Sequence, residues 1–141
     1  MCIRDSIKGF ASGAGCNCLI QTLLACLNDN GLLCVADVPW IRHELRRRFR
    51  QGENRVTEAN YLDLRNHWTS IIDLIGISAR RHGCDPTNQI HARNFNVTAV
   101  LEERRIVVER DGVGAISLFV LNEGNQHFVP LLRNRQRWLR R

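Results

Sequence analysis

The hydrophobic pattern of this 141-residue chain changes from a helical to a strand-like period near the loop HGCDPTN (residues 82–88). Before that loop, apolar residues recur at a spacing of four, as they do on the buried face of a helix. After it, short segments rich in β-branched and aromatic residues alternate with turn signals such as DGVG. Helices followed by strands predict an α+β domain, in which N-terminal helices pack on a mostly antiparallel C-terminal sheet.

Four helices are expected in the first part of the chain. The first covers residues 18–27, and its wide apolar surface predicts that it is buried. Asp37 is expected to cap the second helix, with Pro39 in the first turn. Thr57 is expected to cap the third, and the fourth is expected to start near Ser70. In the second part, strands are predicted at residues 96–102, 105–110, 115–122 and 127–133.

The length and composition indicate one globular domain. Hydrophobic residues make up 44% of the chain and charged residues 24%, which supports a packed core and excludes a disordered tail. No apolar run approaches the roughly 20 residues that span a bilayer. The first six residues, MCIRDS, match what a common transposon-end sequencing adapter encodes. Residues 1–6 are therefore interpreted as an artefact, and 7–141 as one domain that lacks its true N-terminus.

The cysteines do not predict a disulfide framework. Once Cys2 is set aside with the adapter, an odd number remains, with no repeated spacing. This pattern favours a reducing compartment. The remaining cysteines are Cys16, Cys18, Cys26, Cys34 and Cys84.

One of these thiols is placed as a nucleophile would be. Cys18 follows the small-residue loop Gly13-Ala14-Gly15 and opens the first predicted helix. The positive end of the helix dipole and nearby backbone N–H groups favour a thiolate there, and the thiolate is the reactive form of cysteine. The same loop can direct N–H groups at a developing oxyanion.

A thiolate needs a base or an imidazolium partner, and His127 is the candidate. It opens the last predicted strand, directly after the turn-like segment NEGNQ. The start of a strand and the start of a helix can meet at the edge of a sheet. The sequence therefore predicts a Cys18–His127 dyad formed by the two ends of the chain.

The segments GAGCNCLIQTLL (13–24) and GNQHFVPLL (124–132) resemble the ovarian tumour (OTU) family of cysteine peptidases, and bacterial effector members above all. The family pattern is roughly Gly-Asp-Gly-x-x-Cys-Leu-Phe near the start and His-aromatic on a strand near the end. The resemblance implies a papain-like domain with Cys18 as nucleophile and His127 as general base. It also implies an oxyanion hole formed by the N–H of Cys18 and one N–H from Ala14, Gly15 or Cys16.

This chain departs from the family pattern at three positions. Ala14 replaces the usual Asp and Ile20 replaces Phe. Many members carry Asn or Asp two residues after the histidine to orient its ring, whereas this chain has Val129. The third member is therefore expected elsewhere, and Asn125 is the candidate, together with an acid lost from the N-terminus.

The resemblance also implies a reaction, partners and a location. The expected substrates are conjugates of ubiquitin or of a ubiquitin-like protein, cleaved after the C-terminal glycine of the modifier without a cofactor or a metal. The expected location is the cytoplasm, or a host cytosol after secretion as an effector. An inactive relative that only binds ubiquitin is the alternative within the family.

Other interpretations of these residues stay open. Cys18 can be a buried structural cysteine, since a thiol packs as a small hydrophobe, and Cys26 and Cys34 are expected to be core residues. A zinc site could combine Cys16-x-Cys18 with His82-x-Cys84, although both spacings are tighter than the usual knuckle. The remaining histidines are interpreted as partly exposed: His43, His67 and His91.

Arginine supplies nearly all of the positive charge. The formal net charge is +6, and Lys8 is the only lysine in the chain. Two segments, residues 42–50 and 133–141, combine arginines with an aromatic residue, as nucleic-acid-binding segments do. A solvated helix face and a terminal tail are the favoured interpretation, so nucleic acid is an alternative partner only.

Overall fold

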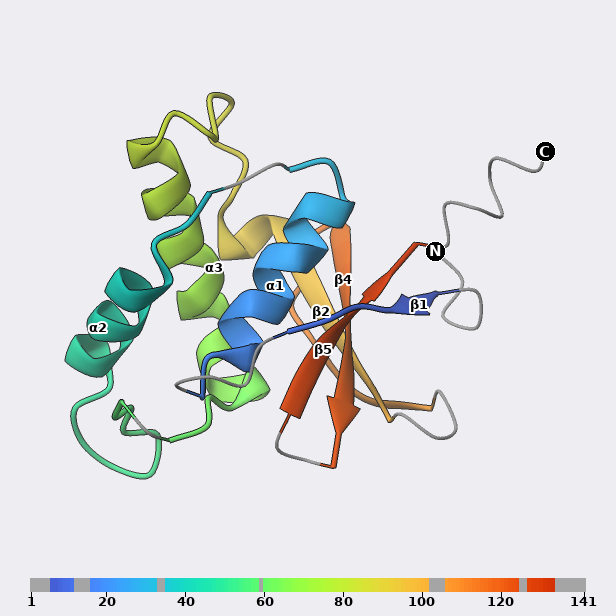
Figure 1. Ribbon diagram of the computed structural model, residues 1–141, viewed down its shortest axis with the longest axis horizontal. Helices are drawn as coiled ribbons and strands as arrows, with labels where there is room; N and C mark the ends of the chain where they lie inside the picture. Colours follow the sequence, from blue (N-terminus) through green and yellow to red (C-terminus); the bar gives the residue numbers. More distant parts are fainter. Residues whose placement is uncertain are drawn as a thin grey trace.

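The computed structural model describes residues 6–11, 16–32, 35–58, 60–101, 106–124 and 127–133. Within these ranges the chain forms three α-helices, a short 3-10 helix and five strands (Figure 1). This confirms the predicted α+β class. The elements in chain order are β1 (Ile7–Lys8), α1 (Cys18–Asp29), α2 (Val38–Arg48), α3 (Leu64–Arg81), η3 (Ala92–Asn94), β2 (Phe95–Leu101), β3 (Val107–Asp111), β4 (Ile116–Glu123) and β5 (His127–Leu132).

The first two helices form where the sequence predicts them. Helix α1 starts at Cys18 and buries leucines spaced four apart, as expected from its apolar pattern. Helix α2 is capped by Asp37, whose carboxylate accepts a hydrogen bond of 3.1 Å from the backbone N–H of Trp40. Ile41 and Leu45 form the buried stripe of α2.

The prediction of separate third and fourth helices is wrong. Residues 64–81 form one continuous helix, and Ser70 lies inside it because no glycine or proline occurs between Leu64 and Ile75. Asp63 caps this helix by accepting a hydrogen bond of 2.9 Å from Arg65 N–H. The predicted cap, Thr57, lies in the preceding loop, where its hydroxyl accepts a 3.2 Å hydrogen bond from the N–H of Asn60.

The sheet is mixed, with the strand order β1-β5-β4-β2-β3. Three of its four strand pairs are antiparallel, and β2 and β4 are parallel. Strand β3 runs antiparallel to β2 at the edge of the sheet. The chain then reverses again and adds β4 on the other side of β2, so β4 runs parallel to β2. Strand β1 was not predicted, because two residues give no readable hydrophobic period.

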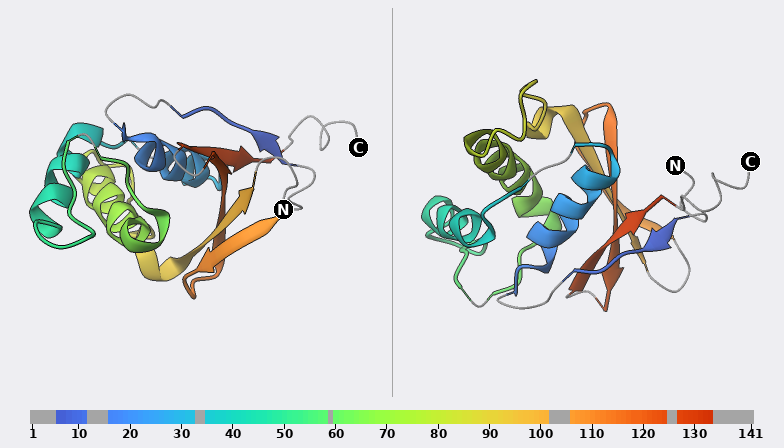
Figure 2. Two further views of the ribbon diagram at one scale, coloured as in Figure 1. Left: turned by 90° about the horizontal axis from the view of Figure 1, so that it is seen from below. Right: turned by 45° about the horizontal axis from the view of Figure 1, so that its top comes forward.

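The helices form a second layer against the sheet (Figure 2). Helix α1 packs on β5 and β4, α3 packs on α1, and α2 packs on α3. Figure 2 shows the sheet curving around α1. The core between the layers is aliphatic, with Trp68 and Phe95 as its largest aromatic members. No helix among the described residues has the length and apolar character needed to cross a bilayer.

The DGVG turn ties the sheet edge to α3. The indole N–H of Trp68 donates a 2.7 Å hydrogen bond to the carboxylate of Asp111, the last residue of β3. Gly112 follows with φ +95°, and a Cβ there would lie 2.8 Å from the backbone oxygen of Phe95 and from the Trp68 ring. Glycine is therefore required for this turn to approach Trp68 so closely.

Candidate active site

Cys18 is the first residue of α1, and only 2% of its surface is exposed. The chain reaches it through an unusual backbone conformation, because Cys16 has φ +58°, in the left-handed region that favours glycine. Such conformations cost about 1–3 kcal/mol and cluster at functional sites. The expected oxyanion-hole residues Ala14 and Gly15 lie outside the described residues, whereas Cys16 is half-buried directly before the helix.

His127 is the half-buried first residue of β5, and its strand runs beside α1 in the same direction. Near the start of both elements, the buried hydroxyl of Thr22 donates a 2.9 Å hydrogen bond to the backbone oxygen of Phe128. At their far ends, the N–H of Arg133 donates a 3.2 Å hydrogen bond to the carboxylate of Asp29.

These two bonds align the ends of α1 and β5. Cys18 lies one helical turn before Thr22, and His127 lies one residue before Phe128. The structure therefore brings the two predicted residues to the same end of the α1–β5 pair. Sequence analysis did not identify Thr22, because a threonine inside an apolar helix has no distinctive pattern.

A carboxylate lies opposite the histidine. The register of β4 and β5 pairs Glu123 directly with His127. Directly opposed residues project from the same face, with Cβ atoms about 4.5–5.5 Å apart. The Glu123 carboxylate also accepts a 2.7 Å hydrogen bond from the ammonium of Lys8. The predicted third member, Asn125, lies outside the described residues, and Glu123 could have been found only from the register of the hairpin.

Arg42 of α2 is a buried charged group on which the thiols of Cys16 and Cys18 act electrostatically. It is 5% exposed, and its Nη2 donates hydrogen bonds to the backbone and side-chain oxygens of Asn60. Within the described part of the chain, Nε and Nη1 have no hydrogen-bond partner. Burial is the largest influence and holds the pKa of Arg42 below its ordinary value, whereas the thiols of Cys16 and Cys18 oppose that shift.

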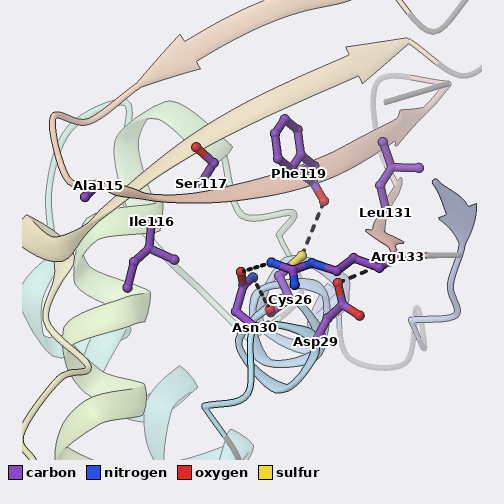
Figure 3. A pocket seen from close by; sticks show the side chains of 9 residues that line it. All are labelled: Cys26, Asp29, Asn30, Ala115, Ile116, Ser117, Phe119, Leu131 and Arg133. Atoms are coloured by element: carbon purple, nitrogen blue, oxygen red, sulfur yellow. Dashed lines mark hydrogen bonds between the residues drawn. The ribbon is translucent and has the colours of Figure 1, made fainter. Parts of the chain in front are cut away.

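Cys26 lies towards the other end of α1 and is a core residue, as predicted (Figure 3). Its thiol donates a 3.3 Å hydrogen bond to the backbone oxygen of Phe119. It lines a cavity of about 340 Å³ beside the Arg133–Asp29 contact. Burial, with a smaller contribution from Asp29, raises the pKa of Cys26 from 9.0 to about 12. This thiol therefore stays protonated and is no competitor to Cys18 as nucleophile. Cys34 lies outside the described residues.

One prediction about the other histidines is wrong. His67 is 3% exposed, and its Nδ1 accepts a 2.9 Å hydrogen bond from the N–H of Asp63 at the start of α3. Its ring also packs edge-on against Phe49, with 4.8 Å between centroids. His67 is therefore structural. His91 is half-buried and His43 is exposed, as expected for residues away from the core.

The zinc interpretation finds no support in the described residues. Cys16, Cys18, His82 and Cys84 all belong to them, and no three His, Cys, Asp or Glu side chains there form a group able to hold a metal ion. The thiol of Cys84 lies 3.5 Å from the backbone oxygen of His82, within its own turn.

Arginines surround a shallow pocket at the end of α2. Its volume is about 440 Å³, and two of its arginines form ion pairs: Arg46 with Glu58 at 2.7 Å and Arg47 with Glu44 at 3.0 Å. The pocket is lined by His43, Arg46, Arg47, Arg50, Arg55, Val56 and Thr57, which we call the arginine pocket.

Comparisons with protein-family models, with curated proteins and with solved structures find no match for this chain.

Replacing Thr22 with Val is expected to destabilise the protein by about 1–3 kcal/mol, because the buried oxygen of Phe128 loses its donor. Urea denaturation measures the change. Thr69→Val is the matched control, since Thr69 is exposed on α3 and its replacement should change stability by less than about 0.5 kcal/mol. Equal losses in the two variants would contradict the role given to Thr22.

The Cys26 thiol is expected to make the protein less stable at alkaline pH. Its pKa is raised on folding from 9.0 to about 12, so its stabilising effect is complete below pH 9 and is lost as the pH rises. Between pH 8 and pH 10 the stability advantage of the wild type over Cys26→Ala should shrink by roughly 1–2 kcal/mol. Denaturation at both pH values tests this, with Cys84→Ala as the control. A constant advantage would refute the burial argument.

Proposed function

We propose that this protein is a cysteine isopeptidase that removes ubiquitin or a ubiquitin-like protein from conjugates. One observation carries the proposal: helix α1 and strand β5 run in the same direction, so Cys18 and His127, one at the start of each, lie at the same end of the pair. The class of substrate comes from the resemblance to OTU peptidases, whose two motifs contain these same residues.

The proposed reaction has two steps. His127 accepts the proton of the Cys18 thiol, and the thiolate attacks the carbonyl carbon of the modifier's C-terminal glycine to form a tetrahedral oxyanion. The N–H of Cys18 and one from Ala14, Gly15 or Cys16 stabilise this oxyanion. The C–N bond then breaks, His127 gives its proton to the leaving lysine amine, and a thioester remains. Water, deprotonated by His127, hydrolyses the thioester and restores the thiol.

Glu123 is proposed to orient the imidazole in place of the Asn or Asp that many OTU peptidases carry after the histidine. It is paired across the hairpin with His127, and its carboxylate accepts a 2.7 Å hydrogen bond from Lys8. A carboxylate in this place favours the tautomer with the proton towards Glu123 and the other ring nitrogen towards the thiol. Val129, two residues after His127, cannot do this.

The decisive experiment is incubation with ubiquitin bearing a C-terminal propargyl group, followed by intact mass measurement. The thiol adds across the alkyne, so reaction increases the mass by that of the whole probe. The wild type and Cys26→Ala should form the adduct, whereas Cys18→Ala should form none. His127→Ala and Glu123→Gln should react more slowly, by about 100-fold or more for the histidine.

The comparison of variants separates the explanations. Adduct formation by Cys18→Ala would overturn the assignment of the nucleophile. If the folded wild type forms no adduct, either the modifier is not ubiquitin or the site is incomplete or inactive, and the same variants would be tested with probes built on other modifiers. Failure with all of them would favour a binding role.

A second candidate function is binding of a polyanion such as single-stranded nucleic acid, and the arginine pocket favours it. Arg46 and Arg47 pair with carboxylates there, whereas Arg50 and Arg55 line the same pocket on the following loop. Cations gathered in a shallow pocket can neutralise several neighbouring phosphates of one strand.

Salt dependence tests this second function. If all four pocket arginines contact phosphates, the logarithm of the affinity for a labelled oligonucleotide should fall with the logarithm of salt concentration at a slope of about −3. Arg50→Gln with Arg55→Gln should lower the slope by about half. Arg110→Gln, an exposed arginine on β3, is the control. Binding without salt dependence would exclude the arginine pocket as the site.

A further inference from the structure

Among the described residues, the buried guanidinium of Arg42 has fewer hydrogen-bond partners than a buried charge needs. Burying an ion is costly unless hydrogen bonds and an opposite charge compensate for lost hydration. Arg42 is 5% exposed, yet only Nη2 is hydrogen-bonded within the described ranges, to oxygens of Asn60 that carry no full negative charge. Its Nε and Nη1 have no hydrogen-bond partner in those ranges.

The ionisable groups that act on Arg42 indicate which side chain can serve as its counter-anion. Four ionisable side chains from three parts of the chain act on it: Cys16 and Cys18 at the start of α1, Arg46 on α2, and Glu58 in the following loop. Arg46 and Glu58 form a 2.7 Å ion pair with each other, and most of the Glu58 side chain is exposed, so their charges largely cancel. The two thiols remain as the groups able to present a negative charge to the guanidinium.

We propose that Arg42 is the resident counter-cation of the thiol centre, stabilising negative charge on the Cys18 sulfur independently of His127. The inference rests on the proposed nucleophilic role of Cys18, although it concerns the thiol and not the substrate. Arginine stays protonated at every pH at which proteins work, whereas an imidazole loses its charge near neutrality. The Arg42 charge therefore supports the thiolate whatever the charge of the imidazole, and this support matters most at low pH, where a thiol is otherwise protonated.

Asn17 is a second sign that this corner holds a charged centre. It lies between the two cysteines, and its Oδ1 is buried without a hydrogen-bond partner among the described residues. As the N-cap of α1 it forms no side-chain capping bond. Polar atoms left in this state are rare in folded proteins, and a catalytic role is one of the explanations for them.

A purely structural role for Arg42 is the competing explanation. Its bonds to Asn60 hold the loop before α3. Asn60 itself closes that loop, because its side chain accepts a 2.9 Å hydrogen bond from Thr57 N–H and donates one of 2.6 Å to the oxygen of Arg55. Asn60→Ala therefore loosens the same loop while leaving the Arg42 charge in place, which makes it the matched control.

The test measures the alkylation rate of Cys18 by iodoacetamide from pH 6 to pH 10, with peptide mass mapping to separate Cys18 from Cys16, Cys26 and Cys84. Arg42→Gln should slow alkylation about tenfold at pH 6.5 and less than about twofold at pH 9.5, because the thiolate forms at high pH without help. Arg42→Lys should restore most of the low-pH rate. The same effects should appear in a His127→Ala chain.

Several results would overturn the proposal. An equal slowing at every pH would show altered access to the thiol and not lost charge. The same pH profile in Arg42→Gln and Asn60→Ala would show a structural role, as would failure of Arg42→Lys to restore the rate.

If Arg42→Gln does not fold, native and urea-unfolded His127→Ala chains decide the question. The proposal requires Cys18 in the native chain to keep its alkylation rate to a lower pH than Cys18 in the unfolded chain. If the rate in the native chain falls at the higher pH, the proposal is refuted. Ubiquitin enters none of these measurements, so failure of the proposed isopeptidase activity is seen separately with the propargyl probe.

Discussion

The alignment of α1 with β5 is the constraint on which the candidate site depends. The 12-residue helix and the 6-residue strand have nearly equal lengths, about 18 Å and about 20 Å. The Thr22 hydroxyl and the Asp29 carboxylate join them at two levels. Two bonds at different levels fix both the direction and the offset of the elements. A shift by one residue of β5 would turn His127 to the other face of the sheet.

The electrostatics of the site come from elements that surround this pair. Strand β4 supplies Glu123 opposite His127, and β1 supplies Lys8, which holds that carboxylate. Helix α2 supplies the buried charge of Arg42. At the other end of α1, burial raises the pKa of Cys26 to about 12 and keeps that thiol neutral.

The differences between prediction and structure have local physical causes. Thr57 followed the usual rule for a helix cap, but its hydroxyl bonds to Asn60 within a turn, and Asp63 caps the helix instead. His67 was expected to be partly exposed, yet it accepts the N–H of Asp63 and packs on Phe49. Both outcomes depend on how the loop at residues 49–63 folds back on α3, and no periodic pattern encodes that path.

The sequence by itself determined the α+β class, the positions of β2 to β5, the cap of α2 and the candidates Cys18 and His127. Each of these depends on local chemistry: apolar period, capping side chains, or a thiol after a glycine-rich loop. Only the tertiary structure decided the parallel β2–β4 pair, the pairing of Glu123 with His127, and the burial of Arg42. These contacts join residues that are distant in the sequence. Packing and strand register determine them, and neither can be read from the amino-acid sequence alone.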